Sequence, residues 1–311
     1  MGTHIEAVWA QASSGPRKAT ARRLADVAAR SCFAQAGCTP SDIDMLINVG
    51  LYREDSMGEP ALAALIQQDL GANVGQPSAG RTGTFSFDLL NGACGAITAI
   101  QIESGLLKSG VIRLGAIVSS DVQPAFMNPP GTFLRPAGGA ILLRWREDRA
   151  GFTDFGAETF PEYADLFTSG LVWRGRHGIR VPRQRTGHNE MTVTARPGYR
   201  ARLADCAEEA TRRFLRRVGL DVADIDLLVP APSAPEFLDP LRARLGIPGD
   251  RVAYTPENLA GAYTTGPIAA LQAAIQSGRL NEARTVLLLA GGPGATVALA
   301  LYRQTAPQRG R

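Results

Sequence analysis

The sequence predicts an α/β protein built from two similar halves. Two observations lead to this fold class. Segments with the spacing of strands alternate with segments of helical periodicity, and four short strings of the first half return in the same order in the second half. The repeated unit, about 150 residues long, is far larger than a solenoid repeat. The duplication therefore indicates two α/β halves packed about a pseudo-twofold axis.

The elements of the first half follow from periodicity and from helix-ending residues. A helix is expected over residues 19–36, because Leu24, Val27 and Ala28 lie on one apolar stripe and Gly37 ends it. A second helix is expected over residues 94–108, after a run of small residues. The other expected elements are strands at 5–10, 45–49, 85–89 and 114–119 and a helix at 60–70.

The repeated strings stand at equivalent structural positions. In each half, an Arg-Leu-Ala-Asp string opens a helix and an Asp-Ile-Asp string enters a strand, while a Leu-Gly pair and a Ser-Gly pair close helices. Any one match could arise by chance, but the ordered set favours an internal duplication. The matches are 23–26 with 202–205, 42–47 with 224–229, 70–71 with 245–246, and 109–110 with 277–278.

The stretch between the repeats differs in composition from both. It is rich in Gly, Arg and aromatic residues, including Phe160 and Trp173, and we interpret it as a long connection or a cap near the mouth of a site. The expected divisions are an N-terminal half over residues 1–150, this connection over 151–197, and a C-terminal half over 198–311.

Composition excludes several classes of protein. The 311-residue chain is 45% apolar and 20% charged, which is typical of a globular protein. Its net charge of +4 comes without a nucleic-acid-binding motif, so no nucleic-acid partner is expected. No apolar run is long enough for a membrane span and no signal peptide is evident, so we expect a cytoplasmic protein. The four cysteines are Cys32, Cys38, Cys94 and Cys206. Their spacing is not that of a metal site, so we expect reduced thiols and no metal or cofactor.

Cys94 carries the strongest chemical signal. An expected strand ends, the small residues Asn91-Gly92-Ala93 follow, and the thiol stands at the start of an apolar helix. A helix N-terminus favours thiolate over thiol, and its free N–H groups can bind an oxyanion. Gly92 and Gly95 allow a substrate to approach closely. The arrangement corresponds to a nucleophile elbow with sulfur in place of oxygen; the alternative is a buried, inert cysteine.

Several strings resemble β-ketoacyl-[acyl-carrier-protein] synthase III of the thiolase superfamily, and the resemblance covers most of the chain. It implies the thiolase fold, with two duplicated α/β halves in a layered αβαβα arrangement, dimerisation through the strands around Phe85, and Cys94 as the nucleophile. The strings are Phe87-Asp88, Ala93-Cys94-Gly95, Lys108-Ser109-Gly110, Ser119-Ser120-Asp121, Asp226-Leu227-Leu228-Val229-Pro230 and Gly291-Gly292-Pro293-Gly294.

The resemblance also shows where this chain departs from the family. The family pairs its Cys with a His that follows Val-Pro, and here that place is Ala231, which can donate neither a proton nor a hydrogen bond. The family Asn aligns near Gly261, while Asn258 is three or four positions out of register. Asn258 could serve if the loop is rebuilt, or it could cap a turn.

Other site residues are assigned by the same resemblance. Backbone N–H groups of Cys94 and of the loop with Gly292 and Gly294 are expected to hold the oxyanion, and Ala231 and Gly261 are expected to line the substrate site. Glu54 or Glu59, in a charged loop, could replace the lost His as proton carrier, as a related branch uses a loop Glu near here. For Glu59, the alternative is a helix-entry capping role.

The expected function is that of an acyltransferase of the synthase III type. Cys94 would take an acyl group from an acyl thioester and pass it to an acceptor, including a condensation in specialised or fatty-acid metabolism. The lost His makes decarboxylative condensation doubtful. The alternatives are a non-catalytic or half-active subunit of a heterodimeric ketosynthase, and a thioester hydrolase.

The expected partners follow from the family as well. The donor would be acyl-CoA or an acyl carrier protein, and the carrier protein is favoured because the early loop that holds adenine in the family is missing after Gln11. Arginines on two expected helices could dock such an acidic carrier, or form a solvated basic face. The chain would form a homodimer, or a heterodimer with a ketosynthase paralogue.

Overall fold

The computed structural model of the chain describes residues 2–14, 19–54, 60–73, 75, 83–128, 134–148, 150–175 and 187–304. Their strands form a nine-stranded sheet in the order β10-β11-β12-β7-β1-β6-β4-β2-β3 and a separate three-stranded sheet in the order β5-β9-β8. In the large sheet, β1 and β7 share the one registered pair Thr3–Phe152, which is where the strands of the two halves meet.

The elements have the following bounds. The helices are α1 (Ala21–Ala36), α2 (Leu62–Leu70), α3 (Gly95–Lys108), α4 (Tyr199–Arg217), α5 (Pro235–Leu245), α6 (Gly266–Gln276) and α7 (Arg279–Glu282). The strands are β1 (Gly2–Ala12), β2 (Met45–Asn48), β3 (Phe85–Asp88), β4 (Gly115–Asp121), β5 (Met127–Asn128), β6 (Ala137–Arg146), β7 (Gly151–Thr159), β8 (Phe167–Gly175), β9 (Gly187–Ala195), β10 (Leu227–Ala231), β11 (Thr285–Gly292) and β12 (Thr296–Arg303).

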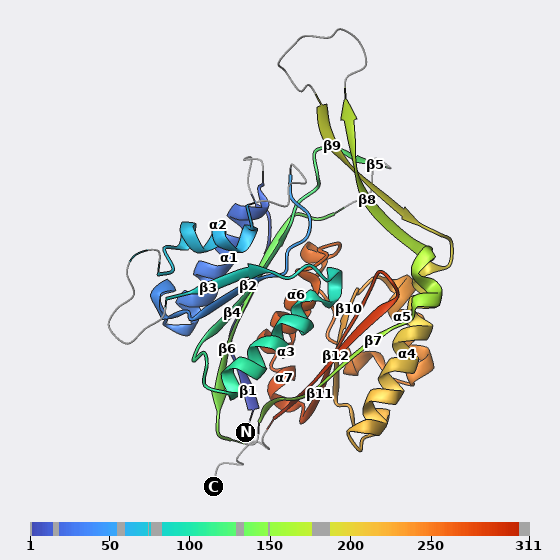
Figure 1. Cartoon of the computed structure of the whole chain (residues 1–311). Coiled ribbons are helices and arrows are strands. Elements are labelled where there is room, and N and C mark those ends of the chain that lie inside the picture. Colours follow the sequence, from blue (N-terminus) through green and yellow to red (C-terminus); the bar gives the residue numbers. More distant parts are fainter. Residues whose placement is uncertain are drawn as a thin grey trace.

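The helices and strands stack in five layers. Helices α1 and α2 cover the outer face of the first half, α4 and α5 cover that of the second, and α3 lies between the strands of the two halves (Figure 1). The central helices α3 and α6 contact strands of both halves and share with them one apolar core, while two further cores lie under the outer helices. The predicted αβαβα arrangement is confirmed.

The duplication is visible in the sheet and in its hydrogen bonds. Strands β2 and β4 pair in parallel, as do β10 and β11, and each pair continues into antiparallel strands. Asp44 accepts backbone N–H bonds from Arg113 and Leu114, before β4. Asp226 accepts the same two bonds from the residues that enter β11. The repeated Asp-Ile-Asp strings therefore have the same structural role in both halves.

The expected first-half elements are confirmed within a few residues. Helix α1 begins after Thr20, whose hydroxyl accepts from the N–H of Arg23, and ends at Gly37, which has a φ of +66°. Glycine adopts this left-handed conformation without a side-chain clash, which explains why it closes the helix. Periodicity did not reveal β6, whose first seven residues, from Ala137 to Leu143, are all buried.

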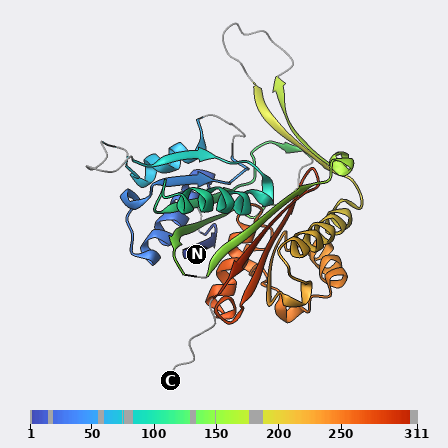
Figure 2. The same cartoon turned by 60° about the horizontal axis from the view of Figure 1, so that its bottom comes forward.

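The stretch 151–197, expected as a connection or cap, has two parts. It begins with β7, which pairs with β12 and belongs to the large sheet. Strands β8 and β9 form a hairpin that projects away from the body of the molecule, as Figures 1 and 2 show. The divisions at residues 150 and 197 stay predictions. Within the described residues, no helix has the length and apolar character needed to cross a membrane.

Candidate active site

Cys94 lies where the sequence placed it. Strand β3 ends at Asp88, and the short 3-10 turn η2 (Gly92–Cys94) leads directly into α3, for which Cys94 is the N-cap residue. Gly92 has a φ of +49°, a left-handed conformation that a residue with a side chain rarely adopts. The predicted strand, small-residue turn and helix start are confirmed.

The thiol of Cys94 is fully buried and acts as a hydrogen-bond donor. Its Sγ lies 3.4 Å from the carbonyl oxygen of Ala290 and 3.5 Å from that of Thr296. Burial raises the pKa of the Cys94 thiol to about 12, because the buried thiolate would lose its hydration. Desolvation therefore opposes the thiolate that the helix N-terminus is expected to favour, and a thiolate at Cys94 stays a prediction.

The second half supplies the surroundings of this sulfur. Ala290 belongs to β11 and pairs with Ala231, the buried last residue of β10. Gly292 ends β11, and a Cβ atom added to it would lie 3.5 Å from the Cys94 Sγ. Gly294, with a φ of +100°, lies in the turn between β11 and β12. The structure thus brings Cys94, Ala231 and Gly292 together at the carboxyl ends of the strands.

One of the expected oxyanion donors already has a partner. The backbone N–H of Cys94 donates to the carbonyl oxygen of Asn91, 3.0 Å away, inside η2. A donor that is engaged in this turn is not free for an oxyanion. The expected role of the Cys94 N–H is therefore wrong for this conformation.

Three tyrosines gather around Cys94, and sequence reasoning missed them. The rings of Tyr52 and Tyr263 lie 5.5 Å apart between centroids, and the hydroxyl of Tyr263 lies against Gly92. Burial, and after it the neighbouring Cys94, raises the pKa of Tyr199. Because these residues come from distant loops and from the start of α4, no local pattern signals that they meet.

Asp121 holds two loops of this site together. Its Oδ1 accepts from the N–H groups of Leu51 and Tyr52, at 3.1 and 2.9 Å. Its Oδ2 accepts from the N–H and the hydroxyl of Thr264, at 2.8 and 2.6 Å. The buried carboxylate therefore joins a loop of the first half to the segment that precedes α6 in the second half, next to Tyr263.

Comparisons of the sequence with known proteins give relatives of one kind. The family described as 3-oxoacyl-[acyl-carrier-protein] synthase III C terminal matches residues 215–304. The β-ketoacyl-[acyl-carrier-protein] synthase III of Acidiphilium cryptum is 28% identical over 294 residues, which cover 91% of this chain and 84% of the relative. That of Sphingopyxis alaskensis is 26% identical over 303 residues, covering 93% and 85%.

Solved structures agree over nearly the whole chain. The crystal structure of the 3-oxoacyl-[acyl-carrier-protein] synthase III of Aquifex aeolicus superposes with a TM-score of 0.76 at 18% identity, covering 97% of this chain and 100% of that one. Xanthomonas campestris OleA superposes with a TM-score of 0.78 at 15% identity, covering 98% and 99%. This chain is a synthase III-like protein with the thiolase fold. The family resemblance expected from the motifs is confirmed.

Two of the expected residues of this synthase III-like protein are exposed, whereas the Cys94 thiol is buried. Asn258 is exposed in the 3-10 turn Glu257–Leu259, and its side chain makes no hydrogen bond to a described residue. Gly261 is exposed as well, and its carbonyl oxygen accepts from the N–H of Arg135. A role of Asn258 beside Cys94 stays a prediction.

The glutamate expected as proton carrier is engaged elsewhere. The Glu54 carboxylate accepts from the N–H of Ala21 at 3.1 Å and so caps the start of α1. This contact gives Glu54 a capping role in this conformation, and its expected catalytic role stays a prediction. Glu59 lies outside the described residues.

The two described histidines also have other partners. His4 bonds to Asp148 through its Nε2 at 2.7 Å, and the ring of His188 stacks on Phe126 at 3.7 Å between centroids. His177 lies outside the described residues.

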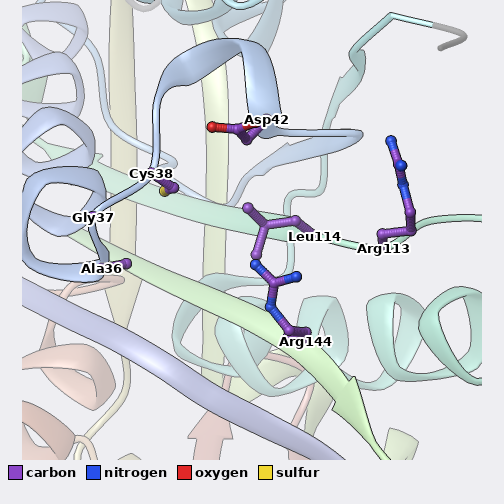
Figure 3. A pocket seen from close by; sticks show the side chains of 7 residues that line it. All are labelled: Ala36, Gly37, Cys38, Asp42, Arg113, Leu114 and Arg144. Carbon is purple, nitrogen blue, oxygen red and sulfur yellow. The ribbon is translucent and has the colours of Figure 1, made fainter.

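A surface cavity of about 340 Å³ lies at the other end of the strands (Figure 3). It opens at the C-terminal end of α1, and Leu114 lines it just before β4 begins. Ligands of α/β proteins bind where parallel strands end, and Cys94 lies at that edge. The cavity is therefore separate from the candidate active site. Its lining residues are Ala36, Gly37, Cys38, Asp42, Arg113, Leu114 and Arg144.

Proposed function

We propose that this synthase III-like protein is an acyltransferase that carries its acyl group on Cys94. The observation that supports the proposal is the position of Cys94 at the start of α3, with Ala290 and Thr296 of the other half against its sulfur. The relatives named above are acyl-condensing enzymes of the synthase III type.

The first proposed step exchanges one thioester for another. The Cys94 sulfur attacks the carbonyl carbon of an acyl thioester, the carbon–sulfur bond of the donor breaks, and the Cys94 proton passes to the departing sulfur. Because the resting thiol is protonated, the proton leaves with the donor thiol rather than before the attack. We propose that the backbone of the turn with Gly292 and Gly294, which lies against the sulfur, faces the carbonyl oxygen.

The second proposed step passes the acyl group to a carbon, oxygen, nitrogen or sulfur acceptor. Ala231, at the place we assign to the family His, is a buried methyl group that cannot donate a hydrogen bond to an enolate. Transfer of the acyl group to a nucleophilic acceptor depends less on the family His than decarboxylative condensation does. We therefore favour acyl transfer over carbon–carbon bond formation.

The proposed partners are an acyl carrier protein or acyl-CoA as donor and a second copy of the chain. Strand β3 forms one edge of the large sheet, and two apolar residues are exposed on and after it, Phe85 at 63% and Leu90 at 58%. An edge with free hydrogen-bonding groups and exposed apolar side chains favours strand pairing with another copy. We propose that the dimer acts in the cytoplasm.

Intact-mass measurement tests the acyl-enzyme directly. The protein is mixed with acyl-carrier-protein and acyl-CoA thioesters, beside Cys94→Ala and the matched control Cys206→Ala, which removes another buried thiol in α4. We expect an acyl-sized mass gain in the wild type and in Cys206→Ala and none in Cys94→Ala. The same gain in Cys94→Ala would contradict the proposal. An acyl-enzyme that decays without an acceptor would indicate a hydrolase.

One observation favours a second candidate, a non-catalytic subunit of a heterodimeric ketosynthase. The Cys94 thiol is protonated, fully buried and bonded to two carbonyl groups, which is what an inert structural cysteine looks like. In that case, no donor would acylate the protein alone. Acylation of a co-purified paralogue would then rise when this chain is added.

A further inference from the structure

The hydroxyl of Tyr263 touches the turn that carries the nucleophile. A Cβ atom added to Gly92 would lie 2.6 Å from this hydroxyl oxygen, a separation at which real atoms overlap. Gly92 is therefore needed for two reasons, its positive φ and the space it leaves for the phenol. Gly92 and Cys94 belong to the same 3-10 turn, so the hydroxyl lies against the turn that ends at the thiol.

The hydroxyl of Tyr263 is available to form a hydrogen bond. It makes no hydrogen bond with any of the described residues, although the Tyr263 side chain is partly buried. Burial, followed by the nearby Tyr52, Tyr199, Asp121 and Cys94, raises the pKa of Tyr263 well above its ordinary value. The phenol therefore keeps its proton at neutral pH and can donate it in a hydrogen bond.

The main chain around Tyr263 is held firmly. The next residue, Thr264, donates its N–H and its hydroxyl to the buried carboxylate of Asp121. The hydroxyls of Thr265 and Ser119 lie 2.5 Å apart in a further buried hydrogen bond. Tyr263 is thus presented by a fixed segment just before α6, as an electrostatic donor requires if it is to act without reorganisation.

The residues that the family resemblance assigns to the oxyanion and substrate site offer no side-chain donor. Ala231 has none, Gly261 is exposed and has none, and the N–H of Cys94 is engaged with Asn91. An attack by sulfur on a carbonyl group builds negative charge on the carbonyl oxygen, and this charge needs a donor. The hydroxyl of Tyr263 is a protonated donor beside the Cys94 turn.

We propose that the Tyr263 hydroxyl donates a hydrogen bond to the acyl carbonyl oxygen when Cys94 attacks, in the place of the lost family donors. The inference rests on the proposed acyl transfer. The new bond joins the Cys94 sulfur to the acyl carbon, the donor's carbon–sulfur bond breaks, and the Cys94 proton goes to the departing sulfur. Tyr263 keeps its own proton throughout and is a catalytic residue by its contact with the reacting oxygen.

Comparing two reactions of the Cys94 thiol distinguishes a hydrogen-bonding role of Tyr263 from a role in packing. Acylation by acetyl, hexanoyl and dodecanoyl thioesters of N-acetylcysteamine builds charge on an oxygen, whereas alkylation by iodoacetamide does not. Both are followed on the Cys94 peptide by mass spectrometry in the wild type, Tyr263→Phe and the control Tyr302→Phe, which removes a buried phenol of β12. For Tyr263→Phe we expect acylation to slow about 100- to 1,000-fold, with alkylation unchanged.

Three results would overturn the inference. Acylation of Tyr263→Phe at the wild-type rate would show that the phenol takes no part. An equal loss of acylation and alkylation would assign Tyr263 to packing, and a larger acylation loss in Tyr199→Phe would move the role to that phenol. If the wild type alkylates but takes up no acyl group, the proposed function itself fails, which is a different outcome from a failure of Tyr263 alone.

Discussion

The two halves of the molecule share a backbone plan and differ where their central helices begin. Asp44 and Asp226 accept the same pair of backbone N–H bonds at equivalent strand entries. In the first half, however, α3 begins directly after Cys94, which we propose as the nucleophile and which ends a 3-10 turn. In the second half, α6 begins at Gly266, directly after the segment with Tyr263. The repeated aspartates therefore have the same structural role in both halves, whereas Cys94 and Tyr263 of the proposed active site are not repeated.

The apolar core also differs between the two halves, at one equivalent position of the central helices α3 and α6. Ser109 and Ser277 follow α3 and α6, and the residue six positions earlier is Glu103 in α3 and Leu271 in α6. Leu271 is buried among apolar residues, whereas the fully buried carboxyl of Glu103 has no hydrogen-bond partner among the described residues. The first half thus tolerates a costly polar group at a position that the second half fills with a leucine.

Removing the carboxylate that joins the halves should have the largest effect on stability. Asp121→Ala leaves three buried or partly buried backbone N–H groups and one buried hydroxyl without their acceptor, so we expect a loss of about 3–5 kcal/mol in the free energy of unfolding. Guanidinium chloride unfolding measures it, with Asp239→Ala, at an exposed position of α5, as the control. A loss no greater than that of the control would show that the two loops are held by other contacts.

The pH dependence of stability should report Glu103. Burial raises its pKa well above the ordinary value of 4.5, so above that pH the folded chain holds a proton that the unfolded chain has released. Stability then falls as pH rises, by about 1.4 kcal/mol for each pH unit over which only the folded state is protonated. Urea unfolding from pH 5 to pH 8 should show this slope in the wild type and a weaker one in Glu103→Gln. Parallel pH profiles for the two proteins would mean that Glu103 is ionised in the folded state.

Making α3 resemble α6 should stabilise the protein. Glu103→Leu replaces an unpartnered buried carboxyl with the residue that the second half has, and we expect a gain of about 1–3 kcal/mol in thermal or urea unfolding at pH 7. Leu271→Glu is the reverse exchange and should destabilise by at least as much. A destabilised Glu103→Leu variant would indicate that the carboxyl is matched to the space beside Gly115, where a Cβ atom would lie 2.3 Å from its Oε2.

The smallest expected effect tests the equivalence of the two strand entries. Asp44→Ala and Asp226→Ala each remove one acceptor of two backbone N–H bonds, and each should cost about 1–2 kcal/mol because the freed N–H groups are near solvent. Measured side by side in urea, the two losses should agree closely. A much larger loss at one position would show that the repeated aspartates have diverged in their structural role.

Much of the fold was predictable because its signals are local or repeated. The Ser-Gly and Leu-Gly helix ends and the Asp-Ile-Asp strand entries act within a few residues, so the sequence shows them directly. The position of Cys94 was predictable for the same reason, since a strand, a small-residue turn and a helix follow one another along the chain. The hairpin of β8 and β9 was not, because neither strand alternates buried and exposed side chains: β8 is almost wholly exposed and β9 is mostly half-buried.

The state of the candidate site depended on contacts between distant residues. Cys94 meets carbonyl groups that are about 200 residues away in sequence, and these contacts bury the thiol and raise its pKa where the helix start alone predicts a thiolate. Glu54 is held by the start of α1 rather than by the sulfur.

The sequence by itself determined the α/β class, the duplication, the synthase III resemblance and the place of the cysteine at a helix start. Only the tertiary structure decided that Tyr263 reaches Gly92, that Asp121 joins the two halves, and that Asn258 faces solvent. The physical reason is that periodicity and turn chemistry act over a few residues, whereas desolvation and hydrogen bonding at a site depend on whichever segments the fold brings together.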